Sequence, residues 1–79
     1  MNVLKEPALE VLKQLIDEQQ RKLEACARRI RQNITAEDLL QPNDYPELEL
    51  HPYFRHEEGI LDGLRMAHMA LANREVLNR

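Results

Sequence analysis

One stretch of sequence, residues 7–33, constrains the fold more than any other. It has no glycine, and its only proline is its first residue, where a helix tolerates a missing N–H group. Apolar residues recur at alternating spacings of three and four, which is the period of one helix face. We therefore predict a helix over about 7–33 with coiled-coil character, about 40 Å long at 1.5 Å per residue. Six of the eight positions in this register are apolar, and the other two are Gln19 and Asn33. In chain order the eight positions are Leu9, Leu12, Ile16, Gln19, Leu23, Cys26, Ile30 and Asn33.

A second helix is predicted over about 52–78. Pro52 suits a first helical position, with His51 as its cap, and Glu57 and Glu58 follow in the early turns, where acids complement the helix dipole. One broad face of this helix is expected to be apolar. That face comprises Tyr53, Phe54, Ile60, Leu61, Leu64, Ala67, His68 and Leu71.

The connector between the helices covers residues 34–51. Thr35 followed by Asp38 has the spacing of a helix cap, which predicts a short helix over about 36–41 that ends at Pro42. Residues 47–50 alternate acidic and apolar, and this indicates an extended strap whose leucines tuck against the helices. The connector acids form either a rim for a basic partner or a solubilising surface. They are Glu37, Asp38, Asp44, Glu47 and Glu49.

Taken together, the pattern predicts one all-α domain over residues 1–79, an antiparallel hairpin of two helices. A 79-residue domain is marginally stable without a disulfide, a structural metal or association with another chain. A single cysteine cannot form an internal disulfide. Each helix carries a second apolar stripe at the end with the chain termini. Since soluble monomers avoid such patches, we expect a homodimer that forms a four-helix bundle. The expected self-association surface is Val11, Leu15, Met66, Met69, Ala70 and Leu77.

Small residues recur every four positions in the second helix, at Gly59, Gly63 and Ala67. Glycine within a helix costs about 1 kcal/mol relative to alanine. Two such residues on one face therefore indicate close approach of another helix. The alternative is that they have no special role.

Residues able to carry catalysis or bind a metal are sparse. Cys26 falls on the apolar register, where a cysteine acts as a small hydrophobic residue with a protonated thiol. His51, His56 and His68 lack the four-residue spacing of a helical zinc pair. We expect His68 to be a core histidine. No metal, cofactor or enzymatic activity is predicted.

Charge is unevenly distributed along the chain. The formal net charge is −3, and residues 35–62 hold eight of the acids against a single base, Arg55. The basic cluster Arg28, Arg29 and Arg31 suggests the alternative function, a small regulator that binds nucleic acid through these side chains. The simpler interpretation is that the arginines complement the helix dipole and pair with acids of the second helix.

The sequence therefore predicts a non-enzymatic module for oligomerisation and protein–protein interaction. Its partner is expected to be a second copy, another protein, or both, and nucleic acid is disfavoured. No apolar run approaches the length of a membrane span, and Glu6 and Glu10 interrupt any signal-peptide core. With one cysteine, a reducing cytoplasmic location is expected.

Overall fold

The computed structural model describes residues 5–73, which form helices and turns. The elements are α1 (Lys5–Ile30), the 3₁₀ turns η1 (Asp38–Leu40) and η2 (Pro42–Asp44), α2 (Pro46–Glu49) and α3 (Pro52–Ala72). No strand occurs within these residues, so the predicted all-α class is confirmed for them. The predicted end of the second helix at residue 78, and Leu77 with it, lie outside the described residues.

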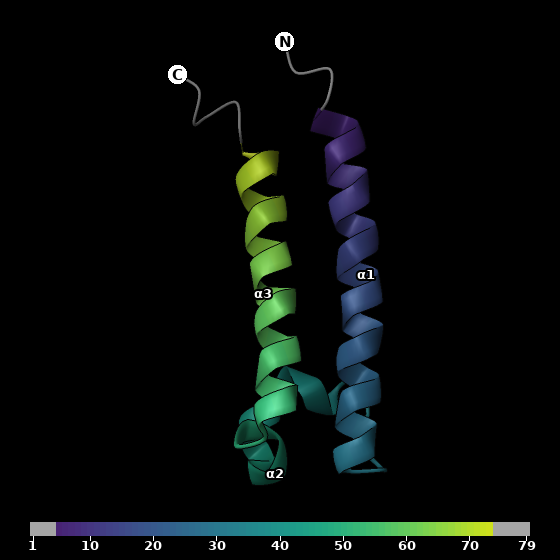
Figure 1. The fold of residues 1–79 in the computed structure, drawn as a ribbon, viewed down its shortest axis with the longest axis vertical. Coiled ribbons are helices and arrows are strands. Elements are labelled where there is room, and N and C mark those ends of the chain that lie inside the picture. The colour runs from purple at the N-terminus through teal and green to yellow at the C-terminus, as the bar shows by residue number, and fades with distance from the viewer. Residues whose placement is uncertain (1–4, 74–79) are drawn as a thin grey trace.

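The two long helices, α1 and α3, lie side by side and run in opposite directions (Figure 1). The connector joins them at one end, here called the closed end, and the chain termini lie at the other. The Cα atoms span 47 × 20 × 20 Å, so the molecule is elongated. Pro7 lies in the first turn of α1, as expected for a residue without an N–H group.

The hydrophobic core is confined to the closed end. No side chain is buried in residues 5–18 of α1 or 62–72 of α3, here called the terminal half. Leu12 and Ile16 of the predicted register are only half-buried there. The terminal half therefore has no core of its own. The buried core consists of Leu23, Ala27, Ile34, Leu48, Phe54 and Leu61.

The first helix ends at Ile30, three residues before the predicted end at Asn33. The amide of Arg31 still donates to the carbonyl of Ala27, and the chain then turns so that Ile34 enters the core. Burial of Ile34 accounts for the early end, because a continued helix would carry this side chain past the core. Asn33, in the turn, is a residue type that turns favour.

The predicted extended strap over residues 47–50 is wrong, because Pro46–Glu49 is one turn of helix. Pro46 takes the first helical position, where no N–H donor is needed, and the carbonyl of Tyr45 accepts from the amides of Leu48 and Glu49. The turn buries Leu48 completely and leaves Leu50 80% exposed, so only one of the two leucines tucks against the helices.

The predicted short helix over 36–41 is realised as the 3₁₀ turn η1, followed directly by η2. The capping pattern is confirmed in detail. The amide of Thr35 donates to Asp38 Oδ2 at 2.9 Å, and the amide of Asp38 donates to Thr35 Oγ1 at 3.2 Å. Tyr45 adds a third bond, its hydroxyl donating to Asp38 Oδ1 at 2.9 Å. Leu40, within η1, remains exposed.

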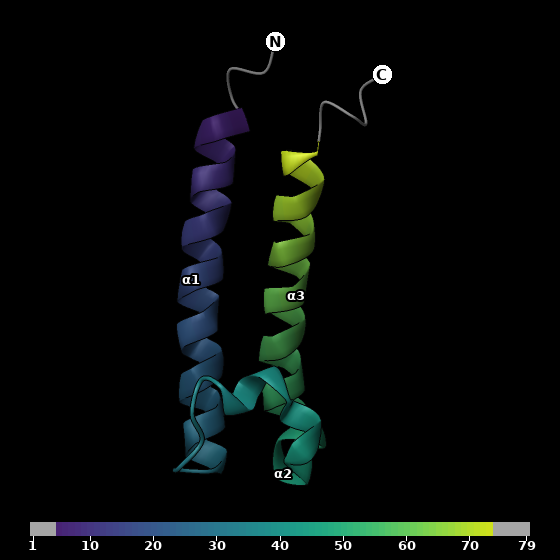
Figure 2. The ribbon, with the colours of Figure 1, turned by 180° about the vertical axis from the view of Figure 1, so that it is seen from behind.

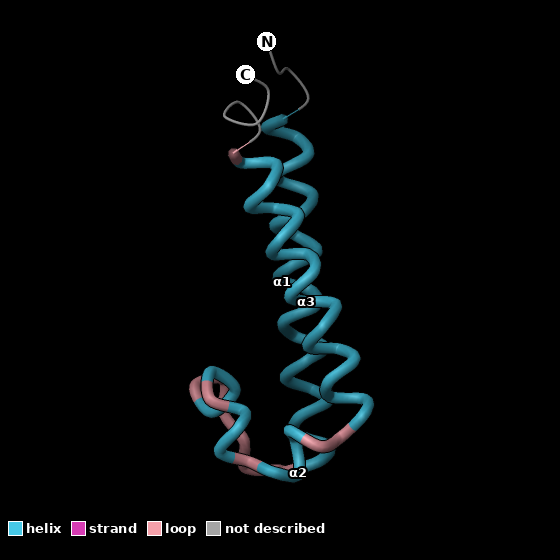
Figure 3. The backbone as a smooth tube through the Cα atoms, turned by 90° about the vertical axis from the view of Figure 1, so that its left-hand side faces the viewer, coloured by secondary structure: helices cyan, strands magenta, loops and turns pink. Residues whose placement is uncertain are grey.

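The connector crosses only one of the two broad faces of the helix pair (Figures 2 and 3). We call this the connector face, and a hollow on it is lined by Leu39 and Leu40 together with both long helices. The opposite face, here called the open face, has a hollow lined only by side chains of α1 and α3. Connector residues therefore cover part of the connector face, whereas none of them lines the hollow of the open face.

Candidate functional site

The open face can be traced along both helices from its hollow at the closed end. Lys22, Cys26 and Arg29 of α1 and Tyr53 of α3 are among its lining residues. Helical residues seven positions apart share one side of the helix. Leu15 lies seven residues before Lys22, and Ile60 lies seven after Tyr53. The open face therefore continues into the terminal half.

Apolar side chains dominate that continuation. Val11 is 55% exposed, and Leu15 and Ile60 are also exposed. Ala67 follows Ile60 at the same seven-residue spacing and is exposed, whereas Leu64 and Leu71 are half-buried beside it. Between Gly59 and Ala72 the only charged residues are Asp62 and Arg65, and both line the hollow of the connector face. The open side of α3 is thus uncharged over this stretch.

The structure divides the predicted self-association surface between the two faces. Val11 and Leu15 lie on the open face. Met66 and Met69 lie four and seven residues after Asp62, which places them on the connector-face side of α3. Ala70 is exposed on α3. The sequence pattern assigned Ile60 and Ala67 to the inner side of the helix, but the structure places them on the open face. Their seven-residue spacing from Tyr53 was the signal in the sequence that they share its side of the helix.

The stripe Gly59, Gly63 and Ala67 is not packed against another helix of the chain. All three residues are exposed, and a Cβ atom built on either glycine would meet nothing within 4 Å. The prediction of close helix packing is therefore not met inside the hairpin. Close packing against this stripe would require a helix from another chain.

Gln19 supplies a polar contact between the two helices. Its side chain is 6% exposed, and its Nε2 atom donates to the backbone oxygen of Glu57 at 3.0 Å and to Glu57 Oε1 at 2.7 Å. The carboxylate of Glu57 is thereby held on the inner side of the open-face hollow. The register position was evident in the sequence, but its partner was not.

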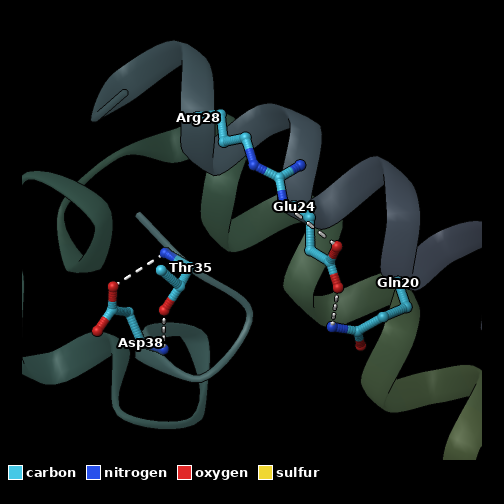
Figure 4. Close-up of polar contacts among 5 residues, drawn as sticks. All are labelled: Gln20, Glu24, Arg28, Thr35 and Asp38. Carbon is cyan, nitrogen blue, oxygen red and sulfur yellow. Dashed lines mark hydrogen bonds and ion pairs between the residues drawn. The ribbon is translucent and has the colours of Figure 1, made fainter. Parts of the chain in front are cut away.

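The three arginines of the predicted basic cluster have different neighbours. Arg28 lies 3.6 Å from Glu24, whose other oxygen accepts from Gln20 (Figure 4). Arg31 pairs with Glu47 at 3.0 Å and lies over the ring of Tyr45, 4.9 Å from its centroid. The acids that neutralise Arg28 and Arg31 therefore come from α1 and α2, not from the predicted acids of α3. Arg29 alone of the three lines the open face.

Cys26 shares a hollow with His51, whereas His56 and His68 lie elsewhere, on α3. Burial raises the pKa of the Cys26 thiol, and the charge of Glu57 adds to this while Arg29 opposes it. The thiol is therefore predominantly protonated near neutral pH. His56 is exposed and His68 half-buried on α3. Within residues 5–73, no three His, Cys, Asp or Glu side chains come together as a metal site.

The acidic connector is only partly free for a partner. Hydrogen bonds from the backbone of Thr35 and from the hydroxyls of Tyr45 and Thr35 lower the pKa of Asp38, and Glu47 is paired with Arg31. The bond to Asp38 correspondingly raises the pKa of Tyr45. Glu37, Asp44 and Glu49 are exposed. Two of the five rim acids thus stabilise the connector itself.

Comparison of the chain with family models, with curated proteins and with solved structures finds no match. Among residues 5–73, none of the helices combines the length and apolar character needed to cross a lipid bilayer.

Proposed function

We propose that the chain is a non-enzymatic self-association module, a homodimer in which two helix pairs pack through their open faces as a four-helix bundle. The observation that carries this proposal is the terminal half. It consists of two helices with no buried side chain, and its open face exposes Val11, Leu15, Ile60 and Ala67. A second copy would bury these side chains on both chains at once, because a two-fold contact uses the same surface twice.

The small residues of α3 support the same arrangement. Gly63, where an added Cβ would meet nothing within 4 Å, lies four residues before the exposed Ala67 of the open face. A helix of the second copy can therefore approach its backbone closely, which increases van der Waals contact. The cost of two glycines within one helix is then offset by packing between chains.

Charge favours one orientation of the two copies. Lys22 and Arg29 line the open face at the closed end. If the copies lay with their closed ends together, these cations would face their own equivalents. If the copies overlapped fully with closed ends opposed, the cations would be buried against apolar side chains, which is costly. We therefore place the terminal halves against each other, with the closed ends at opposite ends of an extended dimer.

The raised pKa of Cys26 is consistent with a structural thiol rather than a nucleophile. We place the module in a reducing, cytoplasmic compartment, where such a thiol stays free. Nucleic-acid binding through the arginine cluster is the weaker alternative, because Arg28 and Arg31 already have acidic partners. As a further part of the proposal, the exposed acids of the connector bind a basic protein partner.

A pair of aspartate variants tests the proposal. Val11→Asp places a charge on the open face of the terminal half, whereas Met69→Asp places one on the connector-face side at a residue of similar exposure, 64% against 55%. Light scattering coupled to size-exclusion chromatography should give a monomer for Val11→Asp and a dimer for Met69→Asp. Equal masses for both variants, with helical circular dichroism retained, would overturn the proposed interface.

A further inference from the structure

The closed end of the open face carries a groove that the proposed dimer leaves uncovered. It consists of two adjoining hollows of about 300 and 270 Å³, which share Cys26, Arg29 and Tyr53. Such volumes are at the lower end of those that bind small ligands or a few side chains. No residue of the terminal half lines either hollow, so the groove is separate from the proposed interface.

One edge of the groove is cationic. Lys22 and Arg29 line it, and neither lies within 4 Å of an acidic oxygen of residues 5–73, in contrast to Arg28, Arg31 and Arg55. The acid on the inner side, Glu57, is engaged by Gln19. These two exposed cations, which have no acidic partner among residues 5–73, are available to a negatively charged ligand.

The floor and the far wall of the groove suit an apolar group. Cys26 and Ile30 contribute sulfur and carbon, and the ring of Tyr53 is 74% exposed, with its centroid 6.0 Å from that of His51. Tyrosine and arginine are enriched where proteins bind one another. An exposed aromatic ring beside unpaired cations therefore favours a ligand that combines negative charge with an apolar side chain.

His51 adds an unmet hydrogen-bonding group. It lines the second hollow, and its Nδ1 atom is buried without a hydrogen-bond partner. The atom has no accessible surface, so a ligand pairs with it only after the imidazole turns toward the hollow; such pairing would be favourable because an unpaired buried polar atom is costly. A peptide offers both groups, together with side chains of either kind.

We propose that this groove binds an acidic peptide segment of a partner protein. Carboxylates of the segment pair with Lys22 and Arg29, an apolar side chain lies against Tyr53 and Cys26, and the peptide backbone meets His51. Nucleic acid is disfavoured because phosphate-backbone binding uses an extended basic surface, whereas this groove has two free cations and one acid.

The test uses a fluorescein-labelled peptide with a Leu-Tyr centre flanked on each side by three glutamates. Fluorescence anisotropy with the full chain at low salt should show saturable binding, and replacing the glutamates by glutamines should abolish it. Arg29→Gln should weaken binding about tenfold, as expected for a lost charge-assisted contact. The matched variant Arg28→Gln removes the same charge from the neighbouring residue and should bind like the unaltered chain.

A second pair of variants tests the aromatic wall independently of charge. Tyr53→Ala should weaken binding, whereas Leu50→Ala, at a side chain exposed to a similar degree, should not. Circular dichroism of each variant establishes that the helices remain. Any of three results would contradict the proposed peptide site: the acidic peptide does not bind, Arg28→Gln weakens binding as much as Arg29→Gln, or a single-stranded oligonucleotide binds tightly and displaces the peptide.

This inference does not rest on self-association. Arg29→Gln should leave the mass in solution unchanged, and Val11→Asp should leave peptide binding intact if the hairpin stays folded. A monomeric unaltered chain that binds the peptide would contradict only the self-association proposal, and a dimeric unaltered chain that does not bind the peptide would contradict only the groove.

Discussion

At the scale of single residues, Gln19 shows how a polar side chain can occupy a helix register position that apolar residues otherwise take. Its amide donates twice to Glu57 across the helix pair. The sequence indicated the buried position, because the three-and-four spacing passes through it. It could not indicate the partner, since Glu57 lies 38 residues away and its level along α3 depends on how the connector packs.

Replacing Gln19 by leucine should destabilise the chain even though the position is buried. The carboxylate of Glu57 would lose its donor, and a hydrogen bond of this kind contributes about 0.5–1.5 kcal/mol. Urea unfolding followed by circular dichroism measures this loss. Gln14→Leu, at an exposed position of the same helix, should change the free energy of unfolding by less than about 0.5 kcal/mol. A Gln19→Leu variant as stable as the original chain would contradict the buried contact.

Asp38 should make the connector sensitive to acid. Its pKa is lowered, chiefly by the Thr35 amide and then by the hydroxyls of Tyr45 and Thr35. A folded pKa below the unfolded value of about 3.9 means that the carboxylate stabilises the fold above that pH, and that the stabilisation is lost as the pH falls through the folded pKa. The NMR shift of the Thr35 amide should therefore titrate with a midpoint below about 4.

The matched variant for this titration is Asp38→Asn, in which the acid transition of the Thr35 amide should disappear. A midpoint at or above the unfolded value would show that the capping bonds do not favour the charged carboxylate.

At the scale of elements, the two long helices were predictable because their apolar period extends over many residues. The predicted starts differ little from Lys5 and Pro52, since proline fixes the entry into a helix. The first predicted end failed because Ile34 packs into the core, a tertiary effect that no local signal reports. The strap failed because four residues are too few to distinguish a period of two from a single turn of helix.

Leu48 and Leu50 provide a direct test of that turn. In a strap with alternating sides the two leucines would be equivalent, whereas in α2 one is fully buried and the other 80% exposed. Leu48→Ala should therefore cost about 2–5 kcal/mol of unfolding free energy, and Leu50→Ala less than about 0.5 kcal/mol. Thermal and urea unfolding of the two variants measure the difference. Equal losses would contradict the helical turn.

At the scale of the whole molecule, the hairpin has a core at one end only. The sequence indicated surplus apolar stripes in the terminal half, but not the face on which each lies. That division depends on how the connector sits, because it covers one side of the helix pair and leaves Val11, Leu15 and Ile60 on the other. Of the predicted surface, Met66 and Met69 consequently lie on the connector-face side of α3, away from Val11 and Leu15.

The orientation of the proposed dimer has a consequence for its length. Pairing through the terminal halves, with closed ends opposed, should give a particle distinctly longer than the 47 Å of one chain. Small-angle X-ray scattering measures this maximum dimension. A dimer no longer than one chain would show that the copies overlap fully and would contradict the role of Lys22 and Arg29 in limiting the contact.

The mass of the unaltered chain in solution tests most directly whether a second copy completes the terminal half. Sedimentation equilibrium at tens of micromolar protein should give twice the 9.3 kDa of one chain, with dissociation on dilution. The melting temperature should rise with concentration, because association stabilises the folded state. A mass of one chain throughout this range, with cooperative melting intact, would contradict the claim that a second copy completes the terminal half.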